Sequence, residues 1–213
     1  MGVQALRRAV LTLALAGLLA SSLACASRKG PPSSPIPDRR VQLARAQDLA
    51  MQAQQAYDKG DLDKAVLLSR EAVAAARDYG QAWNNLGLFL MERNELYDAR
   101  EAFAIASDLL PGDPRPLCNL GVMYLRSGWS EKALGYFERA LERAPSDVQA
   151  LRGAIDASLR LRRHDERTLE RLERAILVEP DAAYRLEFQI RRAQVADELK
   201  EQKRQERESA LRG

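Results

Sequence analysis

The chain has 213 residues, of which 46% are hydrophobic, so it is long enough to bury the core of one ordinary domain. Its 33 basic and 30 acidic side chains give a formal net charge of +3, which falls to +1 (31 basic, 30 acidic) without Arg7 and Arg8, in a segment that we expect to be removed. A chain so close to neutrality exerts no long-range attraction on nucleic acid, which excludes nucleic-acid binding as its main function.

Residues 1–24 have the layout of a secretory signal peptide. Arg7 and Arg8 form a basic start, and an uncharged segment rich in Leu and Ala follows over residues 9–24. Its 16 residues are fewer than the roughly 20 that a bilayer-spanning helix needs. We therefore expect export from the cytoplasm rather than a transmembrane helix.

The sequence Ser-Ser-Leu-Ala-Cys-Ala over residues 21–26 resembles the lipobox of bacterial lipoproteins. The resemblance implies that Cys25 becomes the new N-terminus and is acylated with fatty acids such as palmitate, anchoring the protein to a membrane. Ala26, which is not aspartate, implies the outer membrane, with the protein facing the periplasm. The match departs from the family at Ser22, where leucine is usual.

Two alternatives to lipidation remain open. Ala24-Cys25-Ala26 also fits the A-x-A site of the general signal peptidase, which would release a soluble periplasmic protein. An uncleaved anchor is the other alternative, although the segment is short for it.

Residues 25–38 combine Cys25 with a tether that holds four of the nine prolines. Such a segment has too little apolar surface to fold, and its prolines favour extended polyproline II. We expect a spacer between membrane and domain. Pro32-Ser33-Ser34-Pro35 also fits a PxxP ligand, but the pattern is common in any proline-rich linker.

Two stretches further on repeat the same pattern at a spacing of 34 residues. The first contains Trp83, Asn85, Leu86, Gly87, Leu90, Ala99, Phe103, Ala106 and Pro111, and the second contains Leu117, Asn119, Leu120, Gly121, Tyr124, Ala133, Phe137, Ala140 and Pro145. This period and residue order resemble the tetratricopeptide repeat (TPR) family. The resemblance implies an all-α fold, a right-handed α-solenoid of helix–turn–helix repeats that ends in a C-terminal capping helix.

The physical chemistry of the two clear repeats, 80–113 and 114–147, agrees with this interpretation. Spacings of three and four predict helices over about 80–93 and 96–109, each with one apolar face. Gly87 is small where two helices must approach closely, and Phe103 fills the space around it. Asn94-Glu95 forms the turn between the helices, and Pro111 ends the repeat.

Two weaker repeats flank the clear ones and complete an expected TPR domain over 39–182. Residues 46–79 fit in register, but Ser69 stands where the large Phe belongs. Residues 148–181 fit with one extra residue in the turn. Degenerate end repeats are expected because each has a neighbour on one side only.

Residues 183–213 are predicted to form one charged C-terminal helix. Tyr184, Phe188, Val195 and Leu199 could cover the open face of the last repeat. Beyond Leu199 the segment is polar on all sides, which favours a solvated helix over a coiled-coil surface.

No constellation for catalysis, a cofactor or a metal is evident, so we expect a non-enzymatic protein. The only histidine, His164, stands at a predicted turn without cysteine partners. Cys118 lies mid-helix, where a small apolar packing role is favoured over a nucleophile because no base is placed to activate it.

By the TPR resemblance, the first helix of each repeat lines a concave protein-binding groove. The expected groove residues are Asn84, Leu88, Met91, Arg115, Cys118, Asn119, Val122, Arg126 and Arg152. Lysines that clamp a peptide carboxylate in some family members are absent at Asn84 and Cys118. The groove thus favours an extended or helical peptide with apolar and some acidic side chains.

These observations predict an outer-membrane lipoprotein that acts as a periplasmic adaptor or scaffold for an envelope complex. Its layout is similar to that of pilotins and of adaptors for peptidoglycan enzymes. The alternative is a soluble periplasmic TPR co-chaperone. Self-association through the solenoid ends or the charged tail also remains open.

Overall fold

In a computed structural model, residues 38–212 are described, and every secondary-structure element among them is a helix. The expected signal peptide, Cys25 and nearly all of the tether lie outside these residues. The helices are α2 (Arg39–Asp58), α3 (Leu62–Ala75), α4 (Gly80–Glu92), α5 (Leu96–Leu109), α6 (Arg115–Arg126), α7 (Ser130–Arg143), α8 (Val148–Arg160), α9 (Glu166–Val178) and α10 (Ala182–Arg212). The expected all-α repeat fold is confirmed.

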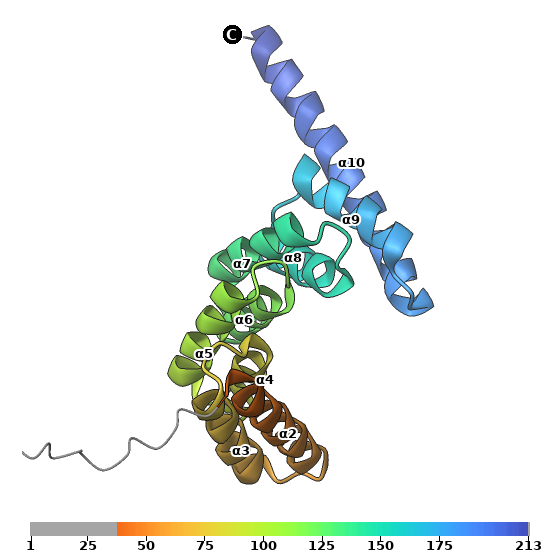
Figure 1. The fold of residues 1–213 in the computed structure, drawn as a ribbon. Coiled ribbons are helices and arrows are strands. Elements are labelled where there is room, and N and C mark those ends of the chain that lie inside the picture. Colours follow the sequence, from red (N-terminus) through yellow and green to blue (C-terminus); the bar gives the residue numbers. More distant parts are fainter. Residues whose placement is uncertain (1–37, 213) are drawn as a thin grey trace, which may run out of the picture. The chain divides into compact units, whose positions relative to one another are not determined.

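The helices stack in chain order within the unit that begins at Arg39 (Figure 1). Each of α2, α4 and α6 packs against the helix that follows it, each pair packs on the next, and α10 packs on α9. Because contacts join sequence neighbours, the fold is an open array with one interior running along it.

Glycine and phenylalanine form the centre of the two middle pairs. A Cβ on Gly87 would lie 2.6 Å from the ring of Phe103, and one on Gly121 would lie 2.7 Å from the ring of Phe137. Gly153 of the next pair approaches the Phe137 ring even more closely, with a Cβ position 2.2 Å away. These approaches confirm that the glycines allow the close helix contact predicted from the sequence.

The turn inside each pair repeats with a period of 34 residues. Gly60, Asn94, Gly128 and Arg162 all have left-handed backbone, with φ of 81°, 63°, 80° and 54°. The residue after each of them donates its backbone N–H to a carbonyl five residues earlier, as when Glu95 donates to Leu90 at 2.9 Å. This is the hydrogen bond of a Schellman helix end, which ends the first helix at a fixed place and turns the chain back.

The fourth pair keeps this register through Arg162 and then departs from it. Arg163 donates to the carbonyl of Ser158 at 2.9 Å, as in the other pairs. The second helix then begins later than in the other pairs, after Asp165, whose carboxylate accepts the backbone N–H of Thr168 at 2.8 Å. The added length therefore lies after the turn, where it does not disturb the end of α8.

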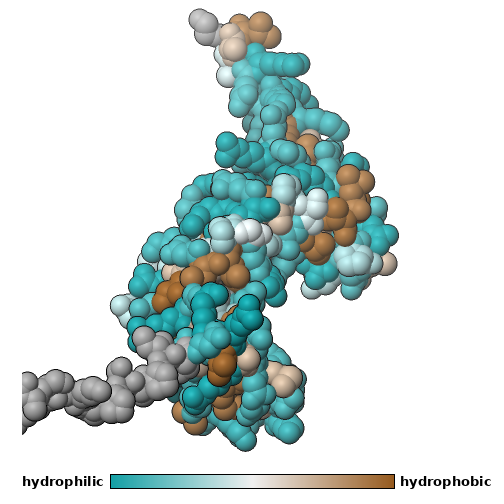
Figure 2. Space-filling view, viewed as in Figure 1, coloured by the Kyte–Doolittle hydropathy of each residue, from teal (hydrophilic) through white to brown (hydrophobic). Residues whose placement is uncertain are grey.

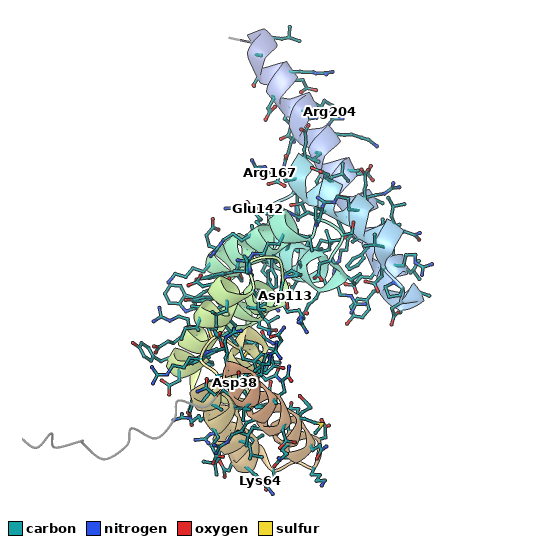
Figure 3. All side chains as sticks on the ribbon, in the orientation of Figure 1. Asp38, Lys64, Asp113, Glu142, Arg167 and Arg204 are labelled. Carbon is teal, nitrogen blue, oxygen red and sulfur yellow. The ribbon has the colours of Figure 1, made fainter. Side chains whose placement is uncertain are left out.

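Arg143 and Asp113 join the two middle pairs. The guanidinium of Arg143 donates to the backbone carbonyls of Leu110 and Asp113 at 3.2 and 3.0 Å, and to the hydroxyl of Ser107 at 2.9 Å. The Asp113 carboxylate, labelled in Figure 3, accepts the backbone N–H of Arg115 at 2.9 Å. The end of α5 and the start of α6 are thus satisfied by specific partners.

The last helix, α10, is held to the array by its first half. Phe188 and Val195 are buried and Leu199 is half-buried, as expected of a helix that covers the last pair. Tyr184 instead remains 44% exposed. Farther along, Lys203 still pairs with Glu166 of α9 at 2.7 Å, and the residues beyond it are exposed. Within residues 38–212, no helix is both long and apolar enough to cross a bilayer.

Candidate peptide-binding groove

A groove of about 610 Å³ lies between α6, α8 and α10. Its apolar wall is formed by Val122, Leu125, Phe137, Ile155, Leu159 and Phe188. Its polar lining is formed by Gln149, Arg152, Asp156, Arg160, Tyr184, Glu187 and Arg191. An apolar floor with a few polar groups at the rim is the usual composition of a binding site.

The sequence of α8 places its groove residues on one helical face. Arg152, Ile155 or Asp156, and Leu159 are three or four residues apart and so lie one above the other. On the side of α8 that faces α7, Gly153 allows Phe137 to approach, which seats α8 close against the preceding pair. The same packing that fills the interior therefore sets the depth of the groove.

Arg152 is fixed between the groove and the start of α10. Its guanidinium donates to the carboxylate of Glu179 at 2.8 and 2.5 Å, and its Cζ lies 3.9 Å from the centre of the Tyr184 ring. The Glu179 side chain is only 1% exposed, and its hydrogen bond from Arg152 lowers the pKa of this carboxyl. Arg152 therefore stabilises the α9–α10 connection and presents an oriented cation at the groove.

The other two arginines of the groove are also paired. Arg160 donates to Asp156 through two hydrogen bonds of 3.0 Å, and Arg191 lies 3.9 Å from Glu187. These pairs are exposed, so each contributes little to stability and is free to exchange partners. Chemically, the groove suits a ligand with apolar side chains whose charged groups compete with Asp156 or Glu187.

Of the residues predicted for the groove, Val122 and Arg152 line it. Asn84 and Asn119 are nearly buried, and the Nδ2 of Asn119 donates to the Oδ1 of Asn84 at 2.9 Å, which links α4 to α6. Leu88 is half-buried against the core and Met91 is buried. None of these four residues lines the groove.

The two exposed arginines predicted for the groove bind within the array. Arg126 pairs with Glu92 at 3.1 Å, a contact between equivalent helices of neighbouring pairs. Arg115 donates to Asp113 at 2.9 Å through Nε, which raises the pKa of the guanidinium and lowers that of the carboxyl.

The expectation that Cys118 faces the groove is wrong. Its side chain is only 1% exposed, and its Sγ lies 3.7 Å from an Oδ1 oxygen of Asp147, which caps α8 and covers it. Burial, followed by the nearby carboxylate, raises the pKa of the thiol to about 12. A thiol protonated at neutral pH and shielded from solvent is a packing group and not a nucleophile.

His164 lies in the α8–α9 turn as expected, but it is not a free surface residue. It is half-buried, and its Nδ1 contacts the carboxylate of Glu198 on α10. The contact joins the turn to the last helix. Within the described part of the chain, no three His, Cys, Asp or Glu side chains gather to hold a metal ion.

The sequence did not predict that α10 forms one wall of the groove. Tyr184, Glu187, Phe188 and Arg191 all face it. On the face that Figure 2 presents, hydrophobic residues occur in separate groups within a mostly hydrophilic surface. The spacing of Tyr184, Phe188 and Arg191 on one helical face was the available clue.

Stacked helix pairs with a 34-residue turn period and an open groove on the first helices define a protein-binding helical repeat. Two family models identify the repeat by its sequence. Residues 114–147 match a family model described as "Tetratricopeptide repeat", and residues 50–114 match a second model of the same description. The chain contains tetratricopeptide repeats over these residues, and no catalytic family is indicated.

Known proteins are similar to parts of the chain. Over 91 residues it is 36% identical to the anaphase-promoting complex subunit CDC16 of Saccharomyces cerevisiae, a match that covers 43% of this chain and 11% of that protein. A structure of PilF from Pseudomonas aeruginosa matches with a TM-score of 0.64 and 23% identity, covering 71% of this chain and 69% of that one. The first TPR domain of Spaghetti (RPAP3), bound to an HSP90 peptide, matches with a TM-score of 0.53 and 18% identity, covering 56% and 95%. At these identities the two structures show a shared fold.

Proposed function

We propose that this protein is a lipid-anchored adaptor that holds a peptide segment of a partner protein in the groove between α6, α8 and α10. The observation that carries the proposal is the groove itself, about 610 Å³ with an apolar floor and oriented charges at its rim. The repeats support a role in protein–protein interaction, and the similar TPR domain of Spaghetti is bound to a peptide.

The place of action is proposed as the periplasmic face of the bacterial outer membrane. The lipobox-like sequence before Cys25 supports an acyl anchor, and two or more acyl chains suffice for stable attachment. Structural likeness to PilF is consistent with a pilotin-like role in assembling an envelope complex. An adaptor for a peptidoglycan enzyme is the related possibility, and a soluble periplasmic co-chaperone is the alternative.

Binding in the groove is tested by site-specific photo-cross-linking in living cells. A benzophenone amino acid replaces Leu159, which lines the groove, and as a matched control it replaces Leu68, which is half-buried on α3 outside the groove. We expect one partner to cross-link from position 159 and not from position 68. The cross-link should disappear when Val122→Glu is added, and an undiminished cross-link in that variant would refute groove binding.

The anchor is tested separately, with Cys25→Ser. Lipidation predicts that the wild-type protein sediments with outer membranes and that the variant does not. If the wild-type protein is recovered in the soluble periplasmic fraction, the co-chaperone alternative replaces the anchored adaptor.

A further inference from the structure

A second surface, formed by α6 and α7, lies outside the groove. It consists of Tyr124, Trp129, Lys132, Gly135, Tyr136 and Arg139, and we call it the aromatic–cation surface. All of these except Trp129 line a hollow of about 380 Å³. Trp129 stands beside it, because the ammonium of Lys132 lies 4.4 Å from the Trp129 ring and 5.6 Å from the Tyr124 ring.

The rings of this surface form a fixed platform. Tyr124 and Tyr136 stack with their centroids 5.3 Å apart and their planes 5° from parallel. The guanidinium of Arg139 lies 5.5 Å from the Tyr136 ring. Stacked rings with cations beside them are a preorganised arrangement, since few side-chain rotamers are left to lose when a ligand binds.

The stability of the fold does not explain Trp129. This residue occupies the position before α7 where a side chain can cap the helix, yet its own side chain makes no capping hydrogen bond. Aspartates at the corresponding places before α3 and α9, Asp61 and Asp165, do cap their helices. Glu95, at the corresponding place before α5, also makes no capping bond, but Trp129 is 58% exposed, so neither a cap nor burial accounts for the large ring at this position.

Gly135 is equally unexplained by packing. Unlike Gly87, Gly121 and Gly153, it has no atom within 4 Å of the position that a Cβ would take. Glycine inside an exposed helix costs about 0.5–1 kcal/mol relative to alanine. Its presence leaves the helix backbone open at the floor of the hollow, where a ligand can approach closely.

Two of the carboxylates of α7 pair away from the cations of this surface. Two of the three glutamates of α7 face other elements, Glu131 pairing with Arg163 and Glu138 with Arg171. Lys132 and Arg139 contact aromatic rings and form no ion pair among the described residues, although Glu142, the third glutamate of α7, lies three residues after Arg139. The surface is therefore positive and flanked by rings.

We propose that the aromatic–cation surface binds an acidic segment of a second partner protein. Carboxylates of the segment pair with Lys132 and Arg139, and its side chains lie on the Tyr124, Tyr136 and Trp129 rings. Because Tyr124 and Tyr136 stack on each other beside a hollow of about 380 Å³, the surface suits a discrete chain whose side chains can enter the hollow. The protein then has two separate docking surfaces, so that one molecule can bridge two proteins.

The probe is a fluorescein-labelled twelve-residue peptide in which glutamate alternates with tyrosine, titrated with the full chain and followed by fluorescence anisotropy. The same peptide with glutamine in place of glutamate is the ligand control. We expect binding of the glutamate peptide and at least tenfold weaker binding of the glutamine peptide. Equal binding of both peptides would overturn the proposal.

Substitutions locate the site. The double variant Lys132→Glu with Arg139→Glu should weaken binding of the glutamate peptide at least tenfold. Its control, Lys59→Glu with Lys64→Glu, makes an equal charge change at the α2–α3 end and should change binding less than twofold (Figure 3). Gly135→Leu, which fills the hollow with a helix-forming side chain, should weaken binding about fivefold while helix content by circular dichroism stays the same. Equal losses in the two charge variants would show attraction to net charge only and would overturn the proposal.

Two further measurements separate this site from the groove and from a membrane contact. The groove variant Val122→Glu should retain the glutamate peptide, so failure of the groove proposal leaves this one intact. The membrane contact is tested with vesicles containing phosphatidylglycerol. If these vesicles bind the wild-type chain but not the variant with Lys132→Glu and Arg139→Glu, and the glutamate peptide does not bind, the surface contacts a membrane and the proposal is overturned.

Discussion

The two middle helix pairs and the two end pairs fill the same interior position in different ways. In the middle pairs, Phe103 and Phe137 occupy it, each with its ring against a glycine. In the first pair, at the same register, Ser69 stands in place of Phe and Ala53 in place of glycine, and both are buried. In the last pair Leu172 takes the position, also fully buried.

The difference shows that the 34-residue period determines the backbone of each pair, while the side chains that fill the interior vary from pair to pair. A large ring in a glycine gap interlocks two helices, whereas small residues let whole helix faces approach. The first pair relies on an alanine face, in which Ala46, Ala50, Ala53 and Ala56 of α2 are all buried. We expect the middle pairs to contribute most to stability and the end pairs to be more tolerant of change.

The largest effect is expected from Phe137→Ala. The Phe137 ring is fully buried and touches glycines of two neighbouring helices. Its loss leaves a cavity that the surrounding helices cannot fill by moving closer together. We expect a loss of about 3–5 kcal/mol in the free energy of unfolding, measured by urea denaturation followed by circular dichroism. The corresponding change in the last pair, Leu172→Ala, should cost less, and an equal or larger cost there would break the comparison.

Gly87→Ala should follow in size. The added Cβ would lie 2.6 Å from the Phe103 ring, which has no room to move because it is fully buried. We expect a loss of about 1–3 kcal/mol in the same measurement. Gly135→Ala is the matched control, since nothing surrounds its Cβ position, and it should raise stability slightly.

Arg152→Met tests an end pair that depends on charge. The change leaves the buried Glu179 carboxylate without its partner and should cost about 1–2 kcal/mol near pH 7, less than for a fully buried pair because solvent reaches Arg152. Since Arg152 lowers the pKa of Glu179, the pair stabilises the fold above the ordinary glutamate pKa of 4.5, and this contribution is lost as pH falls through the lowered value. The difference between variant and wild type should therefore shrink as the pH is lowered below 4.5 and through the lowered pKa of Glu179, and a difference that stays constant would assign the loss to packing instead.

The smallest effect is expected from Ser69→Ala, and in the opposite direction. The buried hydroxyl oxygen of Ser69 has no hydrogen-bond partner among the described residues, so removing it should stabilise the protein by about 1 kcal/mol. The thermal midpoint is the measurement. A destabilised variant would mean that the hydroxyl has a hydrogen-bond partner, such as a bound water. The first pair would then be packed as specifically as the middle pairs.

The sequence predicted the middle of the fold closely because its signals there are local. Helix α5 spans the expected residues 96–109, and α4 ends at Glu92, one residue earlier than expected. Small and large residues at fixed spacing, with Asn94 able to adopt left-handed backbone, determine these bounds within each pair. The same spacing of small and large residues determines which face of the first helix of each pair packs against the interior.

The groove was less predictable because tertiary contacts decide it. Cys118 has a groove position in the repeat, yet the capping carboxylate of the next pair, Asp147, covers it. The wall supplied by α10 depends on where the last helix docks, which Phe188 and Val195 decide through contacts distant from the repeat pattern. Val122 and Arg152 were predicted correctly because each stands at a groove-facing position of a first helix in the repeat, and both line the groove.

Since α10 forms a wall of the groove, the C-terminal end of the array is not modular. Repeat arrays can usually be lengthened by inserting another copy of the unit, because each unit contacts only its neighbours. Here a fifth pair inserted after α9 would separate Tyr184 and Phe188 from α8 and open the groove on that side. Insertions or deletions of whole repeats are therefore tolerable ahead of α6, and between α9 and α10 they would change what the protein can bind.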